Sequence, residues 1–381
     1  MQPTPYKISF PDDMLHDLRE RLSRARWPDQ APGAEWQYGT SVAYLKQLTN
    51  YWCNDFDWRA QEAKLNCFAQ YRVPLAGIDF HFIHEPGVGP KPMPLLLSHG
   101  WPGSIAEFEK IIPLLTNPAA HGGDAADAFT VVAPSLPGYT LSFKPNQPRF
   151  GAIDMAVAFA DLMSKVLGYT RYAAQGGDWG SFVTSRLAVD HPEQLHGIHI
   201  NLLGVRRDLT LADTGTDEEK LFIKELQYFL KEETGYQWIM GTKPQTLAFA
   251  LTDSPVGLAS WIVEKFRTWS DCNGDVESVF TKDEILTNIT LYWATGAINS
   301  SSWPYYARSH GPWPIPDGKR VEVPTAYAAF PKEILRPPRS IAERYYNIQR
   351  WTTMDKGGHF AAMEQPQALA EDIRAFFRQF R

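Results

Sequence analysis

The segment Gly176-Gly177-Asp178-Trp179-Gly180 is the feature that most restricts how this chain can fold. It follows the mostly apolar run 171–175, which predicts a strand, and precedes 181–191, whose apolar spacing predicts a helix. A Gly-x-nucleophile-x-Gly sequence between a strand and a helix is typical of a nucleophile elbow, a strained turn that leaves no room for larger side chains at the two glycines. An ordinary turn is the alternative, because glycine and aspartate are common turn residues.

Aspartate stands where an esterase with such an elbow carries serine, and this changes the chemistry. A serine elbow forms acyl esters from carbonyl substrates, whereas a carboxylate attacks a saturated carbon and forms an alkyl ester. The motif therefore predicts an enzyme whose nucleophile is Asp178.

Strands and helices are expected to alternate around the elbow. Short apolar runs predict strands at 94–98, 129–134, 194–201, 325–330 and 348–354. Helical periodicity predicts helices at 105–115, 155–167 and 365–380. A hairpin is expected from 71–75 and 78–84, which Ala76-Gly77 joins. The alternation predicts an α/β fold with a mostly parallel central sheet, and an elbow within such a sheet is typical of the α/β-hydrolase fold.

Two stretches interrupt this alternation. Residues 1–70 read as an N-terminal helical segment that packs on the core, without recognisable chemistry. Residues 204–309 predict consecutive helices with no strand between them, which indicates an inserted helical cap. The α/β core is thereby expected to comprise residues 71–203 and 310–381.

Composition excludes several classes of protein. The net charge of -6 gives no sign of a nucleic-acid footprint, and 44% apolar residues among 381 suffice for a large core. The three cysteines are too widely spaced for a zinc site or a disulfide set. No run reaches the roughly 18 to 20 apolar residues that a membrane span requires. We expect a cytoplasmic protein without a membrane anchor.

His359 is the candidate general base. It lies in Lys356-Gly357-Gly358-His359-Phe360, after the last expected strand and before the last helix, where an elbow enzyme carries its base. Glu333 follows the preceding strand and is the expected carboxylate that orients the imidazole. Asp355 is too near His359 in sequence, and Asp317 and Glu322 precede the strand.

The segment His99-Gly100-Trp101-Pro102-Gly103 follows the third expected strand. In elbow hydrolases this loop supplies one oxyanion donor, and the residue after the nucleophile supplies the other. The backbone N–H groups of Trp101 and Trp179 are therefore the expected oxyanion hole. A cis peptide bond at Trp101-Pro102 would suit so sharp a turn.

The motifs His-Gly-Trp-Pro-Gly-Ser, Gly-Gly-Asp-Trp-Gly-Ser and Gly-Gly-His-Phe-Ala-Ala together resemble those of the microsomal-type epoxide hydrolases of the α/β-hydrolase superfamily. Phe10-Pro11 and the stretch 22–28 also resemble that family's N-terminal region. Mammalian microsomal members begin with a membrane anchor, which we do not expect in this chain. In this respect the chain is more similar to the soluble fungal and bacterial members. The resemblance also suggests a role in detoxification and a homodimer formed through the N-terminal segment and the cap.

The resemblance implies that two cap tyrosines, Tyr236 and Tyr305, hold and protonate the epoxide oxygen. Because Tyr306 is adjacent, the second assignment could shift by one residue. It further implies conversion of an epoxide to a vicinal diol through a hydroxyalkyl ester on Asp178, with no cofactor or metal. The many aromatic residues suggest an apolar epoxide, and water is the only other reactant.

Three other functions are compatible with parts of the pattern. A haloalkane dehalogenase shares the aspartate nucleophile, but halide leaves without a proton and the tyrosines would be idle. A serine esterase is disfavoured because Ser181 lies outside the tip of the elbow. A binding module on the same fold would lack a member of the triad, and here all members are present.

Overall fold

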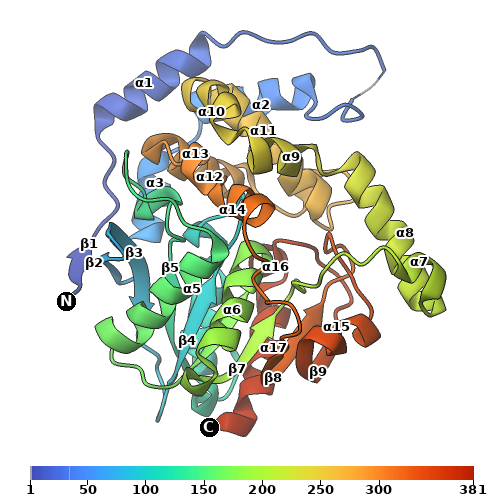
Figure 1. Ribbon diagram of the computed structural model, residues 1–381. Coiled ribbons are helices and arrows are strands. Elements are labelled where there is room, and N and C mark those ends of the chain that lie inside the picture. Colours follow the sequence, from blue (N-terminus) through green and yellow to red (C-terminus); the bar gives the residue numbers. More distant parts are fainter. Residues whose placement is uncertain (1, 34) are drawn as a thin grey trace.

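A nine-stranded sheet forms the centre of the computed structural model, which describes residues 2–33 and 35–381 (Figure 1). The strands lie in the order β1-β2-β3-β5-β4-β6-β7-β8-β9. Their bounds are β1 Thr4–Tyr6, β2 Gln70–Leu75, β3 Ile78–Glu85, β4 Met93–Ser98, β5 Phe129–Pro134, β6 Tyr172–Gly176, β7 Leu195–Ile200, β8 Val321–Ala329 and β9 Tyr346–Thr353. From β5 to β9 every neighbouring pair is parallel, which confirms the expected α/β fold.

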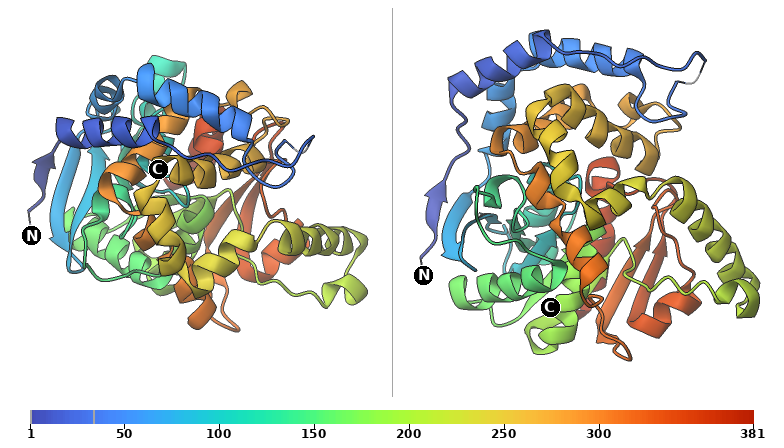
Figure 2. Two further views of the ribbon diagram at one scale, coloured as in Figure 1. Left: turned by 90° about the horizontal axis from the view of Figure 1, so that it is seen from above. Right: turned by 45° about the horizontal axis from the view of Figure 1, so that its top comes forward.

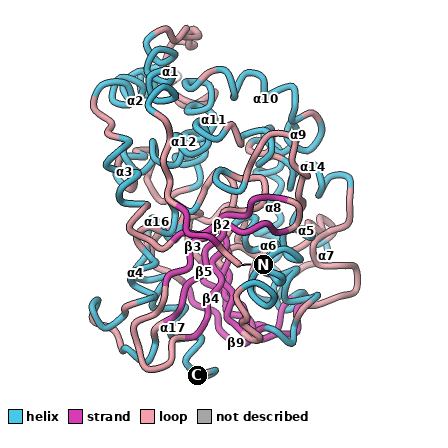
Figure 3. Tube along the Cα trace, turned by 90° about the vertical axis from the view of Figure 1, so that its left-hand side faces the viewer, coloured by secondary structure: helices cyan, strands magenta, loops and turns pink. Residues whose placement is uncertain are grey.

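Helices cover both faces of the parallel part. Helices α4 (Ile111–Thr116) and α17 (Pro366–Phe377) pack together on one face, and α5 (Ala152–Asp161) and α6 (Asp178–Asp190) pack together on the other (Figure 3). Strand β6 is accordingly buried at all its positions, as expected for a parallel strand between two helical layers. The carboxyl ends of these parallel strands meet at one edge of the sheet, where ligands bind in such folds.

Eight α-helices lie between β7 and β8, and we call residues 201–320 the insertion. They are α7 Leu211–Thr214, α8 Asp217–Glu232, α9 Gly235–Thr242, α10 Pro244–Asp253, α11 Pro255–Trp269, α12 Lys282–Thr295, α13 Ile298–Ser301 and α14 Trp303–His310. Most of the insertion lies above the carboxyl ends of the parallel strands (Figure 1). It therefore covers the edge of the sheet where a site is expected.

The N-terminal segment lies across the insertion (Figure 2). Its helices are α1 Asp12–Ser23, α2 Val42–Asn54 and α3 Trp58–Leu65. They pack against α11 and α12, and several side-chain hydrogen bonds join the layers, among them Arg21 to Asp253 at 2.9 Å and Trp52 to Thr290 at 3.2 Å. Among the described residues no single helix is long and apolar enough to span a membrane, although α10 and α11 together have that length and composition, with a bend of 115° between them.

The sequence interpretation was wrong at two places. The first 70 residues are not only helical, because β1 pairs antiparallel with β2 at the edge of the sheet; a three-residue strand that contains Pro5 gives too short a pattern to recognise. The helix expected over 105–115 is split into a 3-10 turn, Ile105–Phe108, and α4. Pro113 lies in the first turn of α4, where its missing N–H is tolerated, and would disrupt a continuous helix.

The last helix is joined to the sheet by a buried carboxylate. Asp372 of α17 accepts hydrogen bonds from Nε of Arg350 (2.7 Å), Oγ1 of Thr352 (2.7 Å) and Nε2 of His199 (3.0 Å). Burial alone would raise the pKa of Asp372, but the hydrogen bonds from these three partners outweigh it and hold the pKa well below its usual range. The ionised carboxylate thus links α17 to β7 and β9.

We expect Asp372→Asn to lower the free energy of unfolding by about 2 kcal/mol at pH 7, because an amide cannot accept from all three donors. The folded-state pKa is depressed, so the carboxylate stabilises the protein above its unfolded pKa of about 3.8 and loses this effect as the pH falls further. Urea unfolding should therefore separate the variant from the parent at pH 7 and progressively less below pH 4. Equal midpoints at pH 7 would show that Asp372 does not stabilise the fold.

Candidate active site

Asp178 lies at the junction of β6 and α6 with a backbone φ of 47°. A positive φ is unfavourable for a residue with a Cβ and persists only where its surroundings enforce it. The strand ends at Gly176 and the helix begins at Asp178 itself. The turn between them is therefore as sharp as the elbow motif predicts, and it raises the carboxylate above the edge of the sheet.

Three glycines make this geometry possible. A Cβ at Gly176 would lie 2.3 Å from the carbonyl oxygen of Gly180, and one at Gly180 would lie 2.0 Å from that of Ser98. A Cβ at Gly100, outside the elbow, would lie 2.2 Å from Oδ1 of Asp178. The backbones of β4, β6 and α6 can therefore approach this closely only with glycine at these positions.

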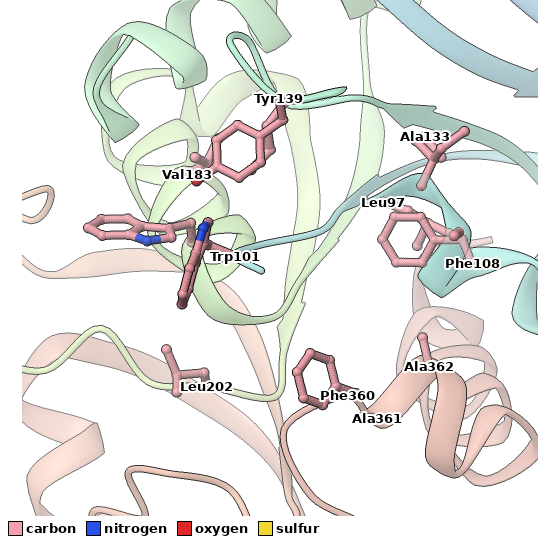
Figure 4. Close-up of a cluster of buried hydrophobic side chains, with 14 of the residues drawn as sticks. Leu97, Trp101, Phe108, Ala133, Tyr139, Val183, Leu202, Phe360, Ala361 and Ala362 are labelled. Carbon is pink, nitrogen blue, oxygen red and sulfur yellow. The ribbon is translucent and has the colours of Figure 1, made fainter. Parts of the chain in front are cut away.

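The loop after β4 holds one oxygen of the Asp178 carboxylate. The backbone N–H of Trp101 donates to Oδ1 of Asp178 at 2.7 Å, and the Trp101-Pro102 peptide bond is cis, as expected. Between described residues, no hydrogen bond joins the Trp179 amide to this carboxylate, so the part of Trp179 in an oxyanion hole stays a prediction. Trp101, Tyr139, Val183, Leu202 and Phe360 bring side chains from five segments into the buried cluster beside the elbow (Figure 4).

His359 lies between two carboxylates. Its Nδ1 is 2.6 Å from Oε1 of Glu333, and its Nε2 is 3.3 Å from Oδ2 of Asp178 without a hydrogen-bonding angle. Burial lowers the pKa of His359, but the charges of Glu333 and Asp178 outweigh it and raise the pKa well above its ordinary value. The imidazole is therefore protonated at neutral pH.

The other carboxylates that the sequence offered for His359 lie elsewhere. Asp317 is exposed and pairs with Arg206 at 2.6 Å, and Glu322 pairs with Arg320 at 3.4 Å. Asp355 is exposed on the loop. Of these candidates, Glu333 is the one that contacts the imidazole.

The insertion tightly packs against the histidine loop. The backbone N–H of His359 donates to the carbonyl oxygen of Trp269, the last residue of α11, at 2.9 Å. The N–H of Gly357 donates to Asp271 at 2.9 Å. Glu364 accepts from the amides of Asp271 (2.9 Å) and Phe360 (3.0 Å), and burial raises its pKa to about 7. The imidazole is thus positioned by the insertion as well as by the core.

Tyr236 of α9 and Tyr305 of α14 descend from the insertion toward the elbow and are 4% and 2% exposed. Their ring centroids are 5.6 Å apart; Tyr236 stacks on Trp101 at 5.4 Å, and Tyr305 meets Trp179 edge-on at 4.8 Å. Burial, with the charge of Asp178, raises the pKa of both phenols well above 10, so both are protonated at neutral pH. Tyr306 instead stacks on Trp303 and His310, which favours Tyr305 as the residue that faces the elbow.

A cavity of about 20 Å³ lies beside Asp178, on the side of His359. Its lining includes Asp178, His359 and Glu107, and burial raises the pKa of Glu107 to about 8. A cavity of 10–15 Å³ or more is large enough for one water molecule. The sequence analysis missed Glu107; its place in the turn after the Trp101 loop, five residues beyond Pro102, is the signal that could have identified it.

The chain matches two family models, described as "Epoxide hydrolase N terminus" over residues 3–108 and "alpha/beta hydrolase fold" over residues 93–229. It is 44% identical to a "Putative epoxide hydrolase" of Stigmatella aurantiaca over 99% of this chain and 85% of that protein. It is 39% identical to "Epoxide hydrolase 1" of Oryctolagus cuniculus over 98% and 88% of the two chains.

Two solved structures, each 30% identical in sequence, are similar over the whole of this chain. Juvenile hormone epoxide hydrolase from the silkworm Bombyx mori has a TM-score of 0.88 over 95% of its own length. Aspergillus niger epoxide hydrolase has a TM-score of 0.86 over 97% of its length.

Gly180→Ala should destabilise the protein by about 2 kcal/mol, because its methyl group would meet backbone oxygens of Ser98 and His99 that cannot move independently. Gly235→Ala is the matched control: it lies at the exposed start of α9 and a Cβ there meets nothing within 4 Å. Thermal unfolding should separate the two variants. If both variants unfold at the same temperature as the parent, the elbow tolerates a Cβ at position 180.

Proposed function

The chain belongs to the epoxide hydrolases of the α/β-hydrolase fold, and we propose that it opens its substrate in two steps, through a covalent ester on Asp178. The observation that carries this proposal is the position of Asp178. Its Oδ1 is bound by the Trp101 amide, and Oδ2 lies 3.3 Å from Nε2 of His359. The Asp178 carboxylate thus lies between the two cap phenols, which can donate protons, and His359, which can act as a base. This arrangement is suited to forming an ester and then hydrolysing it.

In the first step Oδ2 of Asp178 bonds to one epoxide carbon, and the bond from that carbon to the ring oxygen breaks. Tyr236 or Tyr305 gives its proton to the departing oxygen, since an alkoxide is a poor leaving group. The products are a hydroxyalkyl ester on Asp178 and a tyrosinate. The high pKa of the buried phenols keeps both protonated until the ring opens.

Ester formation also prepares the base. Asp178 loses its charge, so one of the two carboxylates that raise the pKa of His359 no longer acts on it. The imidazolium then passes its own proton to the tyrosinate, which restores the phenol, and becomes neutral with Nδ1 still held by Glu333. Thus the substrate itself converts His359 from an acid to a base.

In the second step the cavity beside Glu107 holds the attacking water. Its oxygen bonds to Cγ of the ester, one hydrogen passes to Nε2 of His359, and the other points to a carboxyl oxygen of Glu107. The Trp101 amide, with that of Trp179, stabilises the oxyanion. Collapse expels the diol oxygen, which takes the proton of the new carboxylic acid, and Asp178 and His359 return to their original charges.

The substrate would approach through an opening that carries both aromatic and charged side chains. A cavity of about 740 Å³ between the N-terminal segment and the insertion reaches Tyr236, and its lining includes Trp36, Tyr38 and Trp261 beside charged residues such as Glu264. We propose it as the entrance for an apolar epoxide. A dehalogenase is disfavoured, because a leaving halide would have no use for two buried protonated phenols.

His359→Gln should form the ester and fail to hydrolyse it. With styrene oxide as the probe, intact-protein mass spectrometry should show one added substrate mass, and Asp178→Ala should show none. In a single turnover of the parent enzyme in ¹⁸O water, the new diol oxygen should come from the Asp178 carboxylate. Solvent label in the diol on that first turnover would exclude the ester route.

Glu107→Leu should slow hydrolysis of the ester by about tenfold or more, since a poorly placed reactant costs up to about 100-fold. Glu107→Gln should retain most of the rate, because its amide oxygen still accepts a hydrogen bond. Rapid-quench measurement of ester formation and decay separates the steps, and formation should be unchanged in both variants. Unaltered decay in Glu107→Leu would remove Glu107 from the mechanism.

A further inference from the structure

Gln237 follows Tyr236 in α9 and holds its hydroxyl group. Its Nε2 donates to Oη of Tyr236 at 2.8 Å in a buried hydrogen bond. Gln237 is only 9% exposed, and nothing in the two-step mechanism above uses it. A buried amide on the proton donor raises the question of what determines its orientation.

Two arginines fix the orientation of the amide. Oε1 of Gln237 accepts from Nη2 of Arg308 at 2.9 Å and from Nη2 of Arg207 at 3.2 Å. A guanidinium can only donate hydrogen bonds. A reversed amide would place its NH2 group against both cations and leave them without an acceptor, so the NH2 group must face Tyr236.

This orientation determines where Tyr236 can send its proton. Because Oη accepts from Gln237, the hydroxyl hydrogen cannot point back to the amide and is directed to another acceptor. Ring opening leaves negative charge on Oη, and a hydrogen bond already directed at that oxygen stabilises it without reorganisation. A hydrogen bond to an ionised oxygen is stronger than one to a neutral oxygen, so Gln237 favours the tyrosinate over the phenol.

The arginines add charge to this effect. Burial and the neighbouring Arg308 lower the pKa of Arg207 to about 10, which leaves it positive at neutral pH. Arg308 lies 5.4 Å from the ring centroid of Trp179 and 5.8 Å from that of Tyr305, so it is also close to the second phenol. The positive charge lies behind the amide, on the side away from its bond to Tyr236.

We infer that Gln237 is a positioning residue for ring opening: oriented by Arg207 and Arg308, it keeps Tyr236 a donor toward the substrate and stabilises the tyrosinate. This inference rests on the proposed function and takes Tyr236, of the two phenols, as the one that gives its proton. It adds the groups that set the direction and strength of that donation.

Gln237→Glu tests the direction of the hydrogen bond. The replacement has nearly the same shape and can still accept from both arginines, but its carboxylate would accept from Tyr236 and turn the proton away from the substrate. We expect ester formation from styrene oxide to slow by about 100-fold, the scale of a lost general acid. Decay of the ester should stay within about twofold of the parent, and the thermal midpoint should not fall.

Gln237→Met separates this role from packing. It removes the hydrogen bond without reversing it, so its rate of ester formation should lie between those of the parent and Gln237→Glu. A purely structural role predicts the opposite order, with the isosteric Glu nearer the parent. Gln245→Glu, on α10, is the matched control: Gln245 accepts from Asn299 at 2.8 Å on the exposed side of the insertion, and its variant should keep both rates.

The same experiment distinguishes the two levels of inference. If His359→Gln accumulates an ester but Gln237→Glu forms it at the parental rate, the role of Gln237 is wrong and the ester route stands. If His359→Gln accumulates no ester, the proposed function itself fails. Equal slowing of formation and decay in Gln237→Glu would also overturn the inference, because it would indicate a general distortion.

Discussion

The close approach of three backbone segments at the elbow is the constraint on which the rest of the site depends. Glycines at 100, 176 and 180 let β4, β6 and α6 meet at distances that any Cβ would prevent. Asp178 is thereby held at a positive φ, with its carboxylate on the Trp101 amide and in reach of His359. The strained backbone conformation of Asp178 persists because the buried residues around it leave no alternative, as is common at functional sites.

Charge around His359 connects the two halves of the proposed reaction. In the resting protein the imidazole is positive between Glu333 and Asp178. Neutralising one of these carboxylates changes the proton affinity of the ring without any movement of the backbone. A buried site amplifies this change, because little water is present to screen it. In the proposed reaction, the protonated phenols of Tyr236 and Tyr305 would complete the exchange of protons from the opposite side.

Local sequence signals predicted the sheet, the elbow and the order of Asp178, Glu333 and His359, because each depends on a strand end and the few residues that follow it. The residues of the insertion were harder to place. Periodicity did not identify α9 and α14, which are only eight residues long, and Tyr236 and Tyr305 were chosen by resemblance. Glu107 was missed although it lies only five residues beyond Pro102. Gln237 could not be found from sequence, since its surroundings come from segments far apart: it contacts Arg207 and Arg308, which lie 30 and 71 residues away.

The bond between the His359 amide and the end of α11 has a consequence for how molecules move in and out. The N-terminal helices pack on the outer side of the insertion, and the bond to the His359 amide joins its inner side to the core. If the whole insertion moved away from the core, this bond would draw the imidazole of His359 away from Asp178. If the insertion does not open as a unit, substrate and product pass through openings at its sides, and the width of these openings should decide which substrates are admitted.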